Sequence, residues 1–154
     1  MLNSLELKIP PGALAIACAA AMAGIAHHTP SLAWPFPGRL LVAGLLAAGG
    51  AGFGLAGVWS FLKARTTVNP HRPSSASALV VSGAYRITRN PMYLGLLLLL
   101  LAGAAFLANA PALAFPPAFV GYMTRFQIIP EERALLRQFG AAFSDYAKTV
   151  RRWM

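Results

Sequence analysis

The sequence predicts an all-α membrane protein, a polytopic helical bundle of about four spans with a C-terminal amphipathic helix at the membrane interface. Hydrophobic residues make up 57% of the 154 residues and charged residues only 11%, against roughly a quarter in ordinary soluble domains. Charges are absent from residues 9–38, 40–62 and 90–124, and a helix of about 20 apolar residues crosses the hydrocarbon core. This composition excludes an ordinary soluble domain and intrinsic disorder.

The three uncharged stretches give four expected spans, because the third stretch is too long for one crossing. Asn109-Ala110-Pro111 near its middle predicts a hairpin. The second arm contains Pro116-Pro117, so it is either short and kinked or extended through Phe126 to Ile129. A signal peptide is disfavoured for the first stretch because Glu6 and Pro10-Pro11 interrupt its beginning. The predicted spans are residues 12–28, 38–62, 92–108 and 111–129.

The basic residues predict the orientation of these spans. Lys8 precedes the first span, and five basic residues lie between the second and third spans. Six more, from Arg125 onward, lie at or beyond the end of the fourth span. Thus 12 of the 13 basic residues lie on one side, and Arg39 alone lies on the other. By the positive-inside rule both termini are cytoplasmic, and a prokaryotic inner membrane is the expected location. The same surface attracts anionic lipid headgroups. Nucleic acid is not an expected partner, because no basic and aromatic platform exists apart from the spans.

Residues 130–152 predict an amphipathic interfacial helix. Apolar residues recur at spacings of three and four, with basic residues at the complementary positions. Pro130 suits the first position of a helix, and Gly140 is expected to loosen it. The apolar positions are Leu135, Phe139, Phe143, Tyr146, Val150 and Trp153.

Candidate functional residues lie in the predicted cytoplasmic loop, residues 63–91, and in residues 125–132. Glu131 and Glu132 are half of the four acidic residues, and they either serve a ligand or complement the dipole of a helix N-terminus. Asn90 either contacts a ligand or caps a helix that begins at Pro91. The loop arginines bind either lipid phosphate or a cofactor carboxylate. The single cysteine, Cys18, excludes an intrachain disulfide and a cysteine metal cluster.

Several short motifs in this half of the chain are similar to one superfamily of integral membrane methyltransferases. That superfamily comprises the isoprenylcysteine carboxyl methyltransferases and the phospholipid N-methyltransferases. The resemblance runs from about Thr66 to the C-terminus, and the motifs occur in the family's order on either side of a hairpin. They are Gly83-Ala84-Tyr85-Arg86, Arg89-Asn90-Pro91-Met92-Tyr93-Leu94-Gly95, Pro130-Glu131-Glu132 with Leu135 and Phe139-Gly140, and Tyr146 with Arg151-Arg152-Trp153.

The resemblance implies a single methyltransferase domain over residues 1–154 that takes S-adenosyl-L-methionine from the cytosol. The methyl acceptor is a lipophilic or amphiphilic small molecule or membrane lipid with a sulfur, nitrogen or oxygen nucleophile. No metal and no protein nucleophile are implied, and Arg89 and Asn90 are candidates for positioning residues. The cofactor-site candidates are Tyr85, Arg86, Arg89, Asn90, Pro91, Tyr93, Glu131 and Glu132, with Arg125 as a further arginine that can hold the cofactor's carboxylate.

Asn90 departs from the family's pattern, because many members have His at this position. An Asn side chain forms hydrogen bonds but cannot act as an acid or base near neutral pH. A mechanism that needs His there is therefore in doubt, and His71 is a substitute in the loop. Replacing Glu132 by Gln is expected to weaken cofactor binding and leave the fold intact.

Two other functions stay open from the sequence. Sterol reductases share a related hairpin and an arginine-proline-tyrosine motif but use NADPH, and they are much longer. A non-enzymatic four-span exporter is disfavoured because no Asp or Glu lies within the predicted spans. The second span also carries small residues that serve either helix packing or a ligand, namely Gly49, Gly50, Gly52, Gly54 and Gly57.

Overall fold

The computed structural model describes residues 6–64 and 78–154. Every regular element in these two ranges is a helix, which confirms the predicted all-α fold. The predicted loop 63–91 is therefore described only in part, and the candidate substitute His71 lies outside the described residues together with Arg65 and Arg72.

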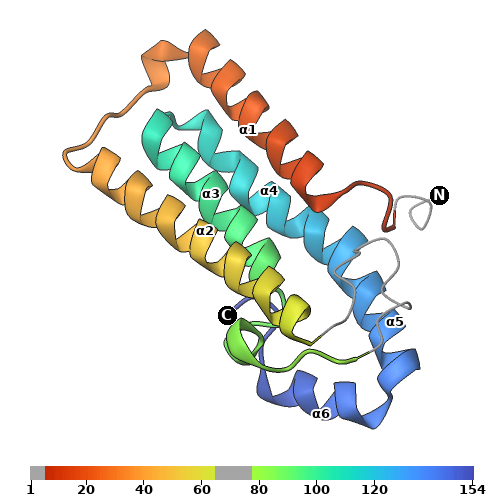
Figure 1. Ribbon diagram of the computed structural model, residues 1–154. Helices are drawn as coiled ribbons and strands as arrows, with labels where there is room; N and C mark the ends of the chain where they lie inside the picture. The colour runs from red at the N-terminus through yellow and green to blue at the C-terminus, as the bar shows by residue number, and fades with distance from the viewer. Residues whose placement is uncertain (1–5, 65–77) are drawn as a thin grey trace.

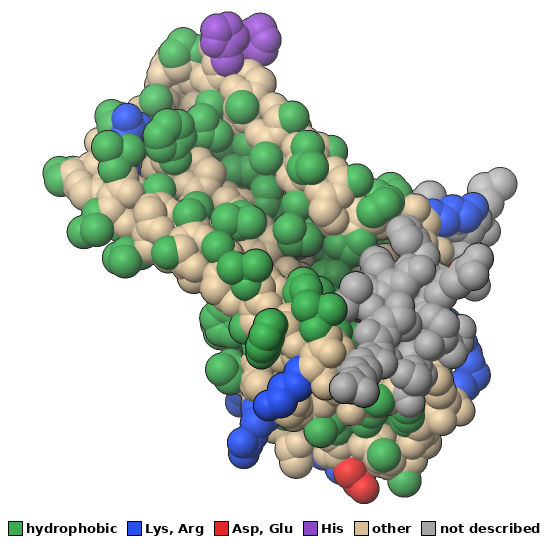
Figure 2. Space-filling model, in the orientation of Figure 1, with side chains coloured by type: hydrophobic (Ala, Val, Ile, Leu, Met, Phe, Trp, Pro, Cys, Tyr) green, Lys and Arg blue, Asp and Glu red, His purple; other side chains and the backbone are tan. Residues whose placement is uncertain are grey.

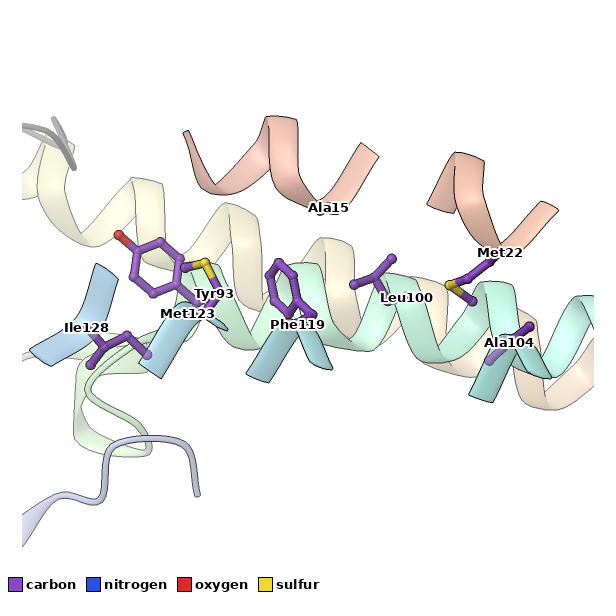
Figure 3. Close-up of a cluster of buried hydrophobic side chains, with 9 residues drawn as sticks. Ala15, Met22, Tyr93, Leu100, Ala104, Phe119, Met123 and Ile128 are labelled. Carbon is purple, nitrogen blue, oxygen red and sulfur yellow. The ribbon is translucent and has the colours of Figure 1, made fainter. Parts of the chain in front are cut away.

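Four helices lie side by side along one axis (Figure 1): α1 (Pro11–His28), α2 (Arg39–Lys63), α3 (Pro91–Leu107) and α4 (Phe115–Tyr122). Helix α3 occupies the centre, since it contacts α1, α2 and α4. Its buried side chains meet those of α1 and α4 in one apolar cluster, and Figure 3 shows Leu100 and Phe119 facing each other within it. The observed helix bounds lie within one residue of the predicted bounds for the first three spans.

Helices α1 and α2 are the candidate membrane spans of the described chain. They contain 18 and 25 residues and are apolar enough to cross a bilayer. Only 17% of each apolar window is buried within the protein, whereas the core helix of a soluble protein is mostly buried. Large apolar side chains such as Leu41, Leu55 and Trp59 therefore face outward from α2, as a lipid environment requires. The number of crossings stays a prediction.

Glycines allow α2 and α3 to approach closely. A Cβ atom on Gly50 would stand 2.8 Å from the Gly95 carbonyl oxygen, and one on Gly57 would stand 2.6 Å from Met92 Cγ. At both positions the nearest atoms belong to α3, so close packing of α2 against α3 explains the two glycines. A Cβ atom on Gly52 would meet nothing within 4 Å.

The second arm of the hairpin extends far beyond α4. A 3₁₀ turn (Pro111–Ala114) leads into α4, a π-helical turn (Met123–Ile128) follows, and α5 (Ile129–Phe139) continues from it. Proline lacks the N–H that an α-helix would direct from Pro130 to the Phe126 carbonyl. The Leu7 N–H donates to that carbonyl at 3.0 Å instead. The N-terminal segment thus satisfies the backbone group that Pro130 leaves open, and the extended form of the arm is the one observed.

The predicted amphipathic helix is divided in two. Helix α5 ends at Phe139, and α6 (Ala141–Thr149) begins after Gly140, whose φ of +51° favours glycine. The basic residues Arg133, Arg137 and Lys148 are exposed, while Phe143 is buried. The apolar and polar faces are therefore as predicted, but the break at Gly140 turns α6 across the end of the bundle (Figure 1).

The described charges gather at one end of the molecule. The N-terminal segment, the C-terminus, α5 and α6 all lie at this end (Figure 1), and blue side chains are frequent there in Figure 2. Glu6 ties the N-terminal segment to this end through ion pairs with Arg125 and Arg133, which lower the pKa of Glu6. At the opposite end, Arg39 Nη1 donates to the Phe106 carbonyl at 3.2 Å.

Candidate functional site

A cavity of about 70 Å³ lies at the charged end, between the end of α2, residues 78–90, α5 and α6. We call it the α5–α6 cavity. Its walls combine aromatic and aliphatic side chains with two carboxylates, one arginine and one amide. The lining residues are Phe61, Ala78, Leu79, Val80, Tyr85, Arg89, Asn90, Ile128, Glu131, Glu132, Leu135, Phe143 and Tyr146.

Glu132 is the centre of an ion-pair network. Its Oε1 accepts from Arg89 Nη2 at 2.8 Å and from Arg152 Nε at 3.0 Å. Its Oε2 accepts from Arg152 Nη2 at 2.6 Å. The side chains of Glu132 and Arg89 are only 18% and 13% exposed, so each charge depends on its partners. The pair with Glu132 also raises the pKa of Arg152.

Glu131 has a different environment, because its described hydrogen-bond donors are neutral. The Tyr93 hydroxyl and Gln127 Nε2 both donate to Glu131 Oε1, each at 2.6 Å. Burial raises the pKa of Glu131 from its ordinary 4.5 to about 7, although the two hydrogen bonds oppose the rise. A carboxyl group with a raised pKa at a cavity wall is a candidate for a functional role.

This shift predicts how stability depends on pH. The charged and titratable groups near the Glu131 carboxyl are Tyr93 from α3, Glu132 from α5, Arg89, Tyr85 and Tyr146. Because the folded state holds the Glu131 proton more tightly, the free energy of unfolding should fall as the pH rises from 4.5 to about 7. Thermal unfolding from pH 4.5 to 8 measures this slope, and Glu131→Gln should flatten it. An equal slope in the variant would contradict the assignment.

The side chains of Tyr85 and Tyr146 are fixed by the local backbone. Gly83 begins the 3₁₀ turn Gly83–Arg86 with a φ of +62°, and a Cβ atom there would stand 2.7 Å from Ser60 Oγ. The turn packs the Tyr85 ring against Phe61 at 5.4 Å. The Tyr146 hydroxyl donates to the Tyr85 carbonyl at 2.7 Å. Burial raises the pKa of Tyr146 to about 12 and raises that of Tyr85, so both phenols stay neutral.

The segment after α6 is hydrogen-bonded to residues 88–90 at the charged end of the molecule. The Arg152 carbonyl accepts from Asn90 Nδ2 at 2.9 Å and from Thr88 Oγ1 at 3.2 Å, and the Arg151 carbonyl accepts from the Arg89 N–H at 2.9 Å. Asn90 does occupy the N-cap position of α3, but its side chain makes no capping hydrogen bond. The capping interpretation is therefore wrong, because the Asn90 amide is directed to the C-terminal segment.

The structure brings five of the nine predicted cofactor-site residues to the cavity wall: Tyr85, Arg89, Asn90, Glu131 and Glu132. Tyr93 lies directly behind the wall through its bond to Glu131. The other three are elsewhere: Pro91 packs near Gly57, Arg86 is exposed, and Arg125 pairs with Glu6 while lying over the Phe126 ring at 5.4 Å.

One hydrogen-bond donor of the Arg89 side chain is left without a partner among the described residues. Its Nη1 donates to the Ala147 carbonyl at 2.7 Å and its Nη2 to Glu132. Its Nε is buried and has no hydrogen-bond partner among the described residues. A buried donor of this kind is normally satisfied, so it is a candidate contact for a bound acceptor atom.

Sequence reasoning missed several residues of the site. Gln127 gave no signal, because a single Gln in an apolar stretch has many roles. The sequence placed Phe143 only on the apolar face of an interfacial helix, whereas Tyr146 was on that face and also in a family motif; both residues line the cavity. Arg152 belonged to the recognised motif Arg151-Arg152-Trp153, and this motif was the signal that a role near the site was available.

Comparisons with known proteins identify the family of the chain. A family model described as phospholipid methyltransferase matches residues 39–142, which is more than half of the chain and includes most of the cavity wall. A Haemophilus influenzae protein, described as uncharacterized, is 41% identical over 63 residues, or 41% of this chain and 100% of that protein. No solved structure matches the chain.

Proposed function

The chain belongs to the phospholipid methyltransferase family, and from this premise we propose that it uses S-adenosyl-L-methionine to methylate a lipophilic or amphiphilic acceptor at the cytoplasmic face of the membrane. The observation that carries the proposal is the α5–α6 cavity, which is lined by Glu131, Arg89 and several aromatic residues. Membrane lipid is the acceptor class that the family favours.

The chemistry of the donor set fits this cofactor. S-adenosylmethionine carries a sulfonium, an ammonium and a carboxylate on one short chain, beside ribose and adenine. Arg89 offers an unpaired N–H for the carboxylate. Glu131 offers a carboxylate for a cation or a hydroxyl, and Asn90 lines the same wall. Tyr85 and the other aromatic residues offer surfaces on which a planar base can pack.

The size of the cavity limits how much of the cofactor it can enclose. Ligand pockets usually measure about 300–1,000 Å³, whereas the α5–α6 cavity measures about 70 Å³. It therefore encloses one part of the cofactor.

The reaction needs little from the protein beyond placement. The cofactor, when bound, would supply an activated methyl group for direct transfer to the acceptor's nucleophile. Arg89 and Asn90 hold the cofactor in line, and the apolar walls exclude water. An acceptor amine or thiol has to lose its proton to solvent before or during transfer, and neither Arg89 nor Asn90 has to accept that proton, so an Asn in place of the family's His is compatible with transfer.

The membrane arrangement is part of the same proposal. With four crossings, the charged end of the bundle faces the cytoplasm, where the cofactor is available, and both termini lie on that side. The outward apolar surfaces of α1 and α2 contact lipid, so an acceptor reaches the protein from the bilayer. Labelling of the cysteine in Arg39→Cys and in Lys148→Cys, each combined with Cys18→Ala, from each side of the membrane tests this orientation.

We expect the detergent-purified protein to bind S-adenosylhomocysteine with micromolar affinity and not to bind NADPH. Isothermal titration calorimetry with each ligand measures both. Transfer of a radiolabelled methyl group from S-adenosylmethionine to phosphatidylethanolamine, to prenylated cysteine and to small thiols then identifies the acceptor. Lys148→Ala is a suitable control, because Lys148 is exposed and pairs only with Asp145 among the residues described.

Other results would replace the proposal. Binding of NADPH alone would favour the reductase interpretation, and binding of neither ligand would favour a non-enzymatic membrane protein. No observation on the described residues favours either alternative.

A further inference from the structure

Four aromatic residues line the α5–α6 cavity. Phe61 comes from α2, Tyr85 from the 3₁₀ turn, and Phe143 and Tyr146 from α6. The rings form two edge-to-face pairs, Phe61 with Tyr85 at 5.4 Å and 74°, and Phe143 with Tyr146 at 6.4 Å and 64°. Aromatic faces carry partial negative charge and attract cations within about 6 Å.

The charges around the cavity point to the same kind of ligand. The Glu132 carboxylate is already shared by Arg89 and Arg152. Glu131, in contrast, accepts hydrogen bonds from the neutral Tyr93 and Gln127. It is the lining carboxylate without an arginine or lysine partner among the described residues, so a cation in the cavity would gain a counterion there.

The volume limits what such a cation can be. A water molecule needs roughly 10–15 Å³ of comparable space, so about 70 Å³ holds a group of a few heavy atoms. A sulfonium or a methylated ammonium has this size, and its charge is spread over methyl groups that pack against rings.

We propose that the α5–α6 cavity is an onium site, in which Phe61, Phe143 and Glu131 hold the positively charged sulfonium or methylammonium group of a ligand. The inference rests on the proposed function and deepens it, because it assigns to this chain's own residues the preference for the charged ligand. The onium has two possible sources, the sulfonium of the cofactor and the ammonium of an amine acceptor.

Calorimetry on the purified full chain separates these sources. S-adenosylmethionine and S-adenosylhomocysteine differ by one methyl group and one positive charge. If the cavity holds the sulfonium, the charged ligand should bind about 3- to 30-fold more tightly, as cation–π contacts imply. If it holds the acceptor's ammonium, the two ligands should bind about equally, and tetramethylammonium should bind the protein already saturated with S-adenosylhomocysteine.

Substitutions test whether the cavity is responsible. Phe143→Leu should bring the preference for the charged ligand to within about twofold, or abolish the binding of tetramethylammonium. The readout is the ratio of the two affinities, so an equal weakening of both adenosyl ligands does not count as a loss of preference. Because Phe143 is buried, Phe61→Leu serves as a second variant, and Glu131→Gln removes the counterion. Phe106→Leu is the matched control, since Phe106 is 56% exposed at the opposite end of α3.

The outcomes distinguish this inference from the proposed function. An unchanged preference in Phe143→Leu, Phe61→Leu and Glu131→Gln would overturn the onium site, as would equal binding of the two ligands without any binding of tetramethylammonium. Failure of the wild-type protein to bind either adenosyl ligand would instead overturn the proposed function.

Discussion

Replacing Glu132 by Leu is expected to lower the free energy of unfolding by about 3 kcal/mol. The carboxylate neutralises Arg89 and Arg152, and its removal leaves two guanidinium groups facing each other at a largely buried position. Removing one partner of a buried ion pair typically costs about 3–5 kcal/mol of stability. The Arg152 side chain is 36% exposed, which favours the lower end of this range. Thermal or denaturant unfolding in detergent micelles, followed by circular dichroism, measures the loss.

Asp145→Ala is the control for this variant. Asp145 also lies at the charged end and pairs with Lys148, but both side chains are more than 70% exposed. Such pairs contribute less than about 1 kcal/mol. Equal effects of the two substitutions would contradict the network. The same geometry revises the prediction that Glu132→Gln leaves the fold intact, so Glu131→Gln is the better probe of ligand binding.

Replacing Gly95 by Ala is expected to cost about 2–3 kcal/mol by overpacking the contact between α2 and α3. A Cβ atom on Gly95 would stand 2.7 Å from the Gly50 carbonyl oxygen and 2.9 Å from the Gly54 nitrogen. Both neighbours are backbone atoms of a helix, so no side chain can rotate away to relieve the clash. The helices must separate along their length, and unfolding measurements in micelles detect the loss.

Gly52→Ala provides the matched control on the facing helix. A Cβ atom at Gly52 meets nothing within 4 Å, and alanine is a better helix former than glycine by about 1 kcal/mol. This variant should therefore be neutral or slightly more stable. If Gly95→Ala behaved like Gly52→Ala, the close contact between α2 and α3 would be wrong.

Much of the fold could be predicted from the sequence, because its signals are local. Uncharged stretches interrupted by prolines and turn residues defined helices at residues 12–28, 38–62 and 92–108, and the structure has Pro11–His28, Arg39–Lys63 and Pro91–Leu107. The family resemblance rested on short motifs, and the family model over residues 39–142 confirms it.

The π-helical turn and the division of the last helix at Gly140 were harder to predict from the sequence. Pro130 resembled the start of a helix, but its missing N–H is compensated by Leu7, more than 100 residues earlier in the chain. No local pattern reveals a donor at that distance. Gly140 indicated a weak point in the predicted helix 130–152. The positive φ that turns α6, however, depends on how α6 packs on the cavity.

The site was predicted only in part, because the environment of each side chain depends on elements that are distant in the sequence. The motifs named Arg89, Glu131 and Glu132, and the structure brings these three residues to one cavity. They did not reveal that Glu132 pairs with two arginines, whereas Glu131 is bound by Tyr93 and Gln127. Adjacent identical residues in a helix point in different directions, and only the neighbouring elements decide their environments.

The contacts of Arg152 have a consequence for how the protein is made. The carbonyl and the guanidinium of Arg152 bind Asn90 and Glu132 of the cavity wall, and Arg152 leaves the ribosome after every residue of that wall. Translation proceeds at about 5–20 residues per second, so α1, α2 and α3 emerge some seconds earlier. A nascent chain can therefore insert and pack its apolar helices while the α5–α6 cavity is still incomplete.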